Sequence, residues 1–92
     1  MFIEFIETQG GTDSAIDVYR AGLVEMHVHR PPESGAVGFI KIKEIQNYAW
    51  NCHGRLLKLK GYSGPQIKLN SEQREALTSL FEKLGITNGV LP

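Results

Sequence analysis

The sequence predicts an α+β fold, an antiparallel sheet of four or five strands with a C-terminal amphipathic helix packed on one face. Two observations predict it. Short segments before residue 61 alternate apolar and polar residues, which is the period of a β-strand. The segment after Asn70 repeats apolar residues at helical spacing instead. The 92 residues, 41% of them hydrophobic and 22% charged, are expected to form a single globular domain over residues 1–92.

The first third of the chain is expected to supply three strands. Met1–Thr8 is rich in Phe and Ile, which favours a buried strand. Residues 9–14, with two glycines, form a loop. Ala15–Arg20 and Leu23–Arg30 then read as a hairpin around Ala21-Gly22.

Strand alternation in the second arm of this hairpin separates two sets of side chains. Val24, Met26 and Val28 share one face. The opposite face carries Glu25, His27 and His29. A helix over residues 14–23 after an Asp13 cap is the alternative, with Ile16, Tyr19 and Leu23 on one side.

The middle of the chain begins with a break at residues 31–35, where two prolines cannot donate to a sheet. Ala36–Lys43 and Arg55–Lys60 are predicted strands that bear lysines. The segment between them, Glu44–Cys52, fits either a helix or a strand that turns at His53-Gly54. Residues 61–65 are a loop.

The closing element is predicted to be a helix over Asn70–Leu84. Asn70 is a good N-cap, and Gln73 stands where a capping box needs it. Gly85 is a natural C′ residue. The apolar stripe, which we expect to pack on the sheet, consists of Leu77, Leu80, Phe81 and Leu84. The terminal residues 89–92 are expected to be a short tail.

Charge is strongly segregated in a chain of zero formal net charge. Residues 36–70 hold six of the ten Lys and Arg residues and one acid, Glu44, whereas the first 35 residues hold six acids. In Ile40–Lys43 and Leu57–Lys60 each lysine follows an apolar residue. If both strands lie in one sheet, their lysines form a cationic patch above an apolar underside, suited to a phosphate backbone or an acidic protein surface.

The candidate binding residues follow from this pattern. Tyr48, Trp50 and Tyr62 lie in or beside the basic segment and could stack on bases, although core packing is the simpler reading for Trp50. Lysines on exposed strands also serve solubility, so a role without a ligand stays open. The candidate contact residues are Lys41, Lys43, Arg55, Lys58, Lys60, Arg30 and Tyr62.

Other kinds of chemistry find little support. Cys52 is a lone cysteine beside His53, and we expect it to be a buried, small apolar residue rather than a nucleophile. His27 and His29 have a spacing seen in metal sites, but no further ligand motif accompanies them. The sequence predicts no enzyme, cofactor, metal, small-molecule substrate or membrane segment, and a cytoplasmic monomer or weak dimer.

Overall character gives the chain one resemblance. Its opening strand Phe2–Thr8, its ladders Phe39–Lys43 and Arg55–Lys60 and its closing helix Asn70–Leu84 resemble the small phage-encoded anti-CRISPR proteins that inhibit type I-F surveillance complexes. The resemblance spans the chain and rests on no specific motif.

The resemblance implies a non-enzymatic inhibitor in an infected bacterial host, which binds the protein subunits and guide RNA of the complex and blocks target-DNA hybridisation. Many such inhibitors are acidic, whereas these exposed strands are basic. That departure argues against DNA mimicry and suits contact with guide-RNA phosphates or with acidic protein surfaces, through Lys41, Lys43, Lys58 and Lys60. The acidic first third could meanwhile meet basic subunits. The alternatives are a free-standing nucleic-acid-binding regulator and an accessory interaction domain with no polyanion ligand.

Overall fold

In the part of the chain that the structure describes, six antiparallel strands form one sheet, and one helix follows them. The structure is a computed structural model that describes residues 1–11, 13–31 and 34–92. Thr12 of the predicted loop and residues 32–33 of the predicted break lie outside the described residues. The elements are β1 (Glu4–Gly10), β2 (Ala15–Ala21), β3 (Val24–Arg30), β4 (Phe39–Ile42), β5 (Tyr48–Asn51), β6 (Leu56–Lys58) and α1 (Ser71–Leu84).

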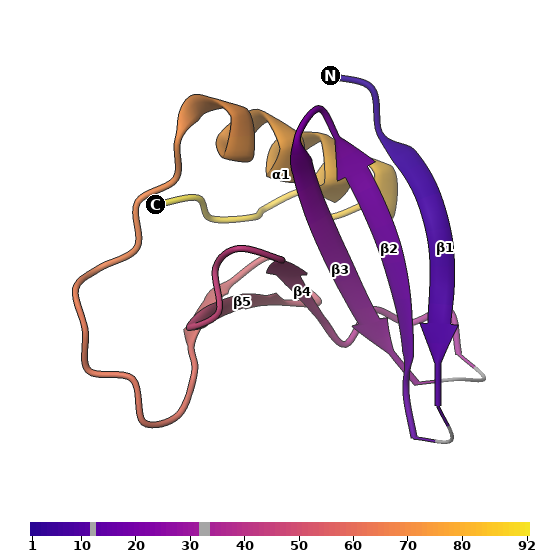
Figure 1. The fold of residues 1–92 in the computed structure, drawn as a ribbon, viewed down its shortest axis with the longest axis horizontal. Coiled ribbons are helices and arrows are strands. Elements are labelled where there is room, and N and C mark those ends of the chain that lie inside the picture. The colour runs from indigo at the N-terminus through magenta and orange to yellow at the C-terminus, as the bar shows by residue number, and fades with distance from the viewer. Residues whose placement is uncertain (12, 32–33) are drawn as a thin grey trace.

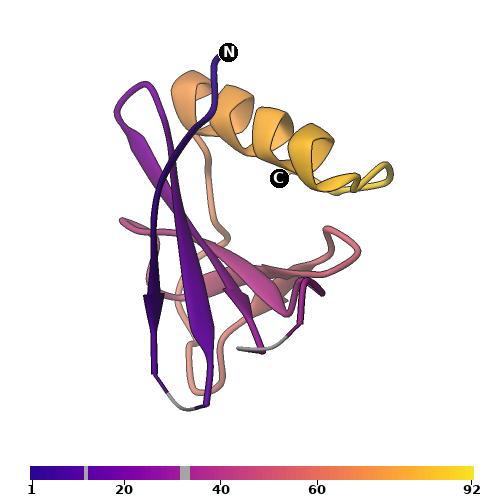
Figure 2. The ribbon, with the colours of Figure 1, turned by 90° about the vertical axis from the view of Figure 1, so that its right-hand side faces the viewer.

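The sheet is a meander, because each strand pairs with the one that precedes it in the chain. Figures 1 and 2 show that the sheet curves around one side of α1, so that the helix covers its concave face. The opposite face carries no helix in the described part of the chain. We call the first the helix side and the second the open side.

The core lies between the helix side of the sheet and α1. Its largest fully buried side chains are those of Trp50, Met26, Ile40, Ile42, Leu77, Leu80 and Val28. The alternation that predicted the faces of β3 is confirmed, since Val24, Met26 and Val28 are buried and their neighbours are only partly buried. The β2–β3 hairpin is confirmed as well, and the alternative helix over residues 14–23 is wrong.

Helix α1 begins and ends where its capping residues predict. The Gln73 backbone N–H donates to Asn70 Oδ1 at 2.7 Å, and the Asn70 N–H donates to Gln73 Oε1 at 3.0 Å. Gly85 ends the helix with φ of 77°, in the left-handed region that favours glycine. Local sequence therefore determines both helix ends.

Strand number was underestimated, because the ambiguous segment Glu44–Cys52 contributes β5 rather than a helix. Trp50 and Tyr48 fill the core from this short strand, and tertiary packing outweighs the helical spacing of the segment. At the other end of the sheet, β1 starts at Glu4 rather than Met1, and its register shifts between Phe5 and Glu7.

Residues 89–92, expected to be a short tail, are instead hydrogen-bonded to the rest of the fold. The indole N–H of Trp50 donates to the Val90 carbonyl at 3.0 Å, and the Val90 N–H donates to the Gly54 carbonyl at 2.9 Å. Gly54 has φ of +77°, and a Cβ there would stand 2.6 Å from the Cα of Gly89. The C-terminal segment is thus bonded to the β5–β6 turn and helps to cover the core.

Candidate binding face

The strand register places the two lysine pairs on different sides of the sheet. Lys41 lies opposite His27, on the open side. Lys58 lies opposite Tyr48, which is 4% exposed and faces the core. Residues directly opposite in an antiparallel pair project to the same face. The predicted continuous lysine patch is therefore wrong.

The error has a simple physical cause. Alternation fixes which residues of one strand share a face, but the phase between two strands depends on their pairing. The β5–β6 register puts Leu57 opposite Ala49, so the β6 leucine projects to the open side. If the lysines of β6 faced the same side as those of β4, Lys58 would lie on the open side and Leu57 on the helix side. The observed register gives the reverse arrangement.

One of the two lysine pairs belongs to an open surface that also presents aromatic rings. We call this surface the β3–β4 face. Its rings, His29 and Phe39, are paired across the strands and stacked, with centroids 4.2 Å apart and planes inclined by 13°. Phe39 is 37% exposed, so part of this stack remains open to solvent. The β3–β4 face comprises Glu25, His27, His29, Phe39, Lys41 and Lys43.

A shallow hollow of about 320 Å³ lies in this face. Phe39 and Leu59 contribute apolar surface, and Lys41 and Lys43 contribute positive charge. The hollow therefore offers a flat, partly apolar contact flanked by cations. Its lining consists of His27, His29, Phe39, Lys41, Lys43 and Leu59.

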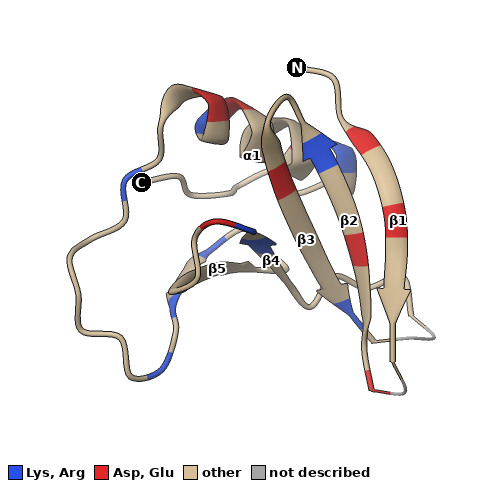
Figure 3. Cartoon of the chain, in the orientation of Figure 1, with Lys and Arg blue, Asp and Glu red and all other residues tan. Residues whose placement is uncertain are grey.

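The β3–β4 face carries a small net positive charge. Lys41 and Lys43 stand on it against one carboxylate, that of Glu25, and Arg20 of β2, which adjoins the face, lies opposite Glu4 of β1. Glu25 Oε1 is 3.7 Å from Arg20 Nη2, and Glu25 Oε2 is 3.8 Å from Lys43 Nζ. A hydrogen bond with His27 Nε2, at 2.7 Å, is the main reason that the pKa of Glu25 is lowered. Figure 3 shows acidic residues on β1 to β3 and also on α1, and basic residues on β2, on β4 and in the segment that leads to α1.

The surroundings of His29 favour its neutral form at pH 7. Burial lowers the pKa of this imidazole, and the nearby His27 and Lys41 lower it further. An uncharged imidazole stacked on Phe39 presents an aromatic surface rather than another cation. The two histidines thus lie together on one face, as the sequence predicts, but their side chains make different contacts.

The remaining predicted contact residues do not join this face. Arg30 lies on the helix side, where its Nε donates to Asp17 Oδ2 at 2.7 Å. Tyr62 packs edge-on against Tyr48, with centroids 5.6 Å apart. Arg55 precedes β6, and Lys60 follows it beyond the strand end. Of the predicted contact residues, Lys41 and Lys43 belong to the β3–β4 face, while Tyr48 and Trp50 belong to the core.

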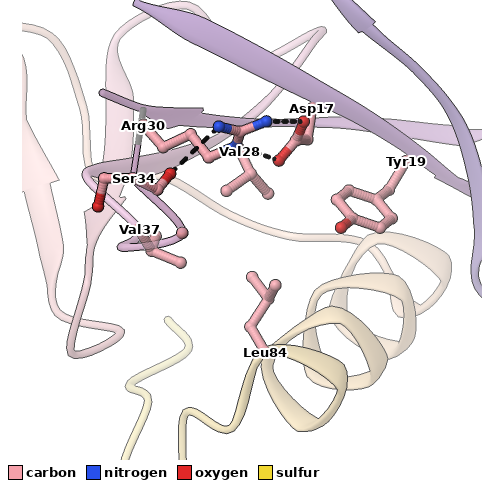
Figure 4. A pocket seen from close by; sticks show the side chains of 8 residues that line it. Asp17, Tyr19, Val28, Arg30, Ser34, Val37 and Leu84 are labelled. Carbon is pink, nitrogen blue, oxygen red and sulfur yellow. Dashed lines mark hydrogen bonds and ion pairs between the residues drawn. The ribbon is translucent and has the colours of Figure 1, made fainter. Parts of the chain in front are cut away.

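A larger cleft of about 560 Å³ surrounds Arg30 on the helix side (Figure 4). Tyr19, Val37 and Leu84 line its less polar part. Its charged groups bind one another: Asp17 accepts from Arg30 Nε and Nη2 and from Thr8 Oγ1, while Arg30 Nη1 donates to the Ser34 carbonyl at 3.1 Å. Through these bonds the Asp17–Arg30 ion pair connects β2, β3 and the loop that follows β3.

Two further expectations concern reactive or metal-binding groups. Cys52 is exposed, so its predicted burial is wrong, because it follows the last residue of β5 and lies in the turn. Among residues 1–11, 13–31 and 34–92, no group of three or more His, Cys, Asp or Glu side chains is arranged to hold a metal ion.

His29 and Phe39 were not among the residues predicted to form a stacking surface. The signal was present, since Phe39 is two residues before Lys41 and therefore shares its face. The stack itself could not be predicted, because it depends on the β3–β4 register.

Comparison with known proteins finds no matching family model, no matching curated protein and no matching solved structure. No helix in the described part of the chain is long and apolar enough to cross a membrane.

Proposed function

We propose that this protein is a non-enzymatic binding protein that contacts RNA phosphates through the β3–β4 face. The observation that carries the proposal is the juxtaposition of Lys41 and Lys43 with the partly exposed His29–Phe39 stack. Lysines bind phosphates as point charges, and aromatic rings beside them accept stacked bases. Such a face needs no catalytic group.

The resemblance to type I-F inhibitors gives the proposal its most specific form. In that form the RNA is the guide RNA of a surveillance complex in an infected bacterial cell, and the bound protein blocks hybridisation of target DNA. Glu4 and Glu7 lie on the same open side, at the β1 edge, and are available to basic subunits of the complex. Asp17 is engaged by Arg30 and is not part of that acidic contact.

Because the two lysine pairs lie on opposite sides of the sheet, they allow a matched pair of variants. Lys41→Glu/Lys43→Glu changes the β3–β4 face. Lys58→Glu/Lys60→Glu makes the same change in net charge at exposed positions in and after β6. A purely long-range attraction would respond to both variants alike, whereas a local contact would respond to the first alone.

The test measures binding of each protein to an immobilised type I-F complex loaded with guide RNA, and separately to the same guide RNA alone. We expect the Lys41/Lys43 variant to bind the complex at least about tenfold more weakly and to have a shallower salt dependence, by about one per lost phosphate contact. The Lys58/Lys60 variant should bind within about twofold of the unmodified protein. Equal loss in both variants would overturn the assignment to the β3–β4 face.

The same measurements separate the alternatives. Binding to free guide RNA as tight as binding to the complex would favour a free-standing nucleic-acid-binding regulator. Absence of binding to both would overturn the proposed function and favour an interaction domain without a polyanion ligand.

A further inference from the structure

We infer that the β3–β4 face selects single-stranded over double-stranded RNA, an inference that rests on the proposed function and names the class of ligand. The starting observation is that His29 and Phe39 form a stacked, partly exposed pair of rings on an open sheet surface. A base can stack on such a pair only when it is unpaired and turned away from its own helix.

The hollow is large enough to receive a base against its floor. Its volume of about 320 Å³ lies at the lower end of the range for small-molecule sites. Phe39 and Leu59 give it apolar surface, while Lys41 and Lys43 give it positive charge. A base in the hollow would therefore bring its flanking phosphates close to both lysines.

The charge state of His29 also favours single-stranded RNA as the ligand. Burial, and then the nearby His27 and Lys41, lower the pKa of its imidazole, which favours the neutral ring at pH 7. A neutral ring stacks on a base without adding a charge, so ring contacts contribute to affinity independently of the salt-sensitive lysine contacts.

Duplex recognition has no comparable basis on this face. An RNA duplex is recognised mainly by its shape and by 2′-hydroxyl and phosphate contacts across its minor groove, while its bases stay paired and stacked inside. Here the described residues of β3 and β4 lie within a sheet, paired on both edges by β2 and β5. A duplex could reach Lys41 and Lys43 with its phosphates but could not stack on Phe39.

The test compares a fluorescently labelled RNA of about ten nucleotides with the duplex of the same sequence, by anisotropy at low salt. Phe39→Ala is the informative variant and Phe39→Tyr is the conservative one. Leu57→Ala is the matched control, because Leu57 is 42% exposed on the same side of the sheet but does not line the hollow. Circular dichroism checks that each variant is folded.

We expect the single strand to bind at least about tenfold more tightly than the duplex. Phe39→Ala should weaken single-strand binding roughly tenfold without changing duplex binding, Phe39→Tyr should restore it, and Leu57→Ala should have little effect. Equal affinity for both RNAs, or equal effects of Phe39→Ala and Leu57→Ala, would overturn the inference.

Failure of the inference can be told from failure of the proposed function. If both RNAs bind equally and Lys41→Glu/Lys43→Glu weakens both, the inference fails and the proposed function stands. If neither RNA nor the guide-RNA complex shows binding that depends on these lysines, the proposed function fails and the inference fails with it.

Discussion

Lys41 and Lys58 lie on opposite sides of one sheet, the first paired with His27 on the open side and the second with Tyr48 on the helix side. The basic segment of the chain therefore does not form one basic surface. Lys41 and Lys43 are the candidate RNA contact, and Lys58 and Lys60 provide a control with the same charge on the other side of the sheet.

The packing of α1 on the sheet gives the first prediction. Leu77 is fully buried in the core, so Leu77→Ala removes packed methyl groups and leaves a cavity. We expect a loss of about 2–5 kcal/mol in the free energy of unfolding, measured by urea denaturation. Thr78→Ala, at an exposed position on the same helix, should change it by less than about 0.5 kcal/mol. Similar losses for both variants would contradict the placement of the helix.

The C-terminal segment gives the second prediction, through Gly54. Gly54→Ala introduces both a positive-φ strain and a clash with the backbone of Gly89. Gly61→Ala introduces the strain alone, since φ there is +87° and a Cβ would meet nothing within 4 Å. We expect Gly61→Ala to cost about 1–2 kcal/mol in unfolding free energy and Gly54→Ala clearly more. Equal costs would mean that residues 89–90 do not pack on this turn.

The ion pair between Asp17 and Arg30 gives the third prediction, a pH dependence of stability. The hydrogen bonds from Arg30 are the main reason that the pKa of Asp17 is lowered, while burial opposes the shift. A carboxyl whose folded-state pKa lies below its unfolded value of about 3.9 stabilises the fold above that value. This stability is lost as pH falls through the folded-state pKa.

The measurement compares melting temperatures of the unmodified protein and Asp17→Asn between pH 7 and pH 2.5. We expect the variant to melt a few degrees lower at neutral pH, and the difference to narrow below about pH 4. A constant difference across this range would show that the charge of Asp17 contributes nothing.

The sequence predicts this fold to the extent that local signals decide it. The helix ends are predicted by Asn70, Gln73 and Gly85. The two faces of β3 are predicted by the alternation from Val24 to Val28. Local signals do not decide β5, because Tyr48 and Trp50 fit either a helix or a strand until the rest of the core is present.

The candidate site could be predicted less completely, because it depends on register between strands. The faces of Lys41 and Lys43 follow from their own strand, but the relation of Lys58 to them follows from the β4–β5 and β5–β6 pairings. The pairing of Arg30 with Asp17 also depends on register, because the β2–β3 hairpin sets Asp17 opposite Val28 and therefore near Arg30. This cross-strand contact places Arg30 away from the β3–β4 face.

An NMR titration of isotope-labelled protein with a short single-stranded RNA at low salt tests directly whether the β3–β4 face binds RNA. The amide signals of His29, Phe39, Lys41 and Lys43 should shift most. The Trp50 indole signal, from an N–H bonded to Val90 on the helix side, should stay in place, as should the amide of Lys58. The largest shifts at Lys58 or Arg55, with the signals of the β3–β4 face unchanged, would show that RNA does not bind at the β3–β4 face.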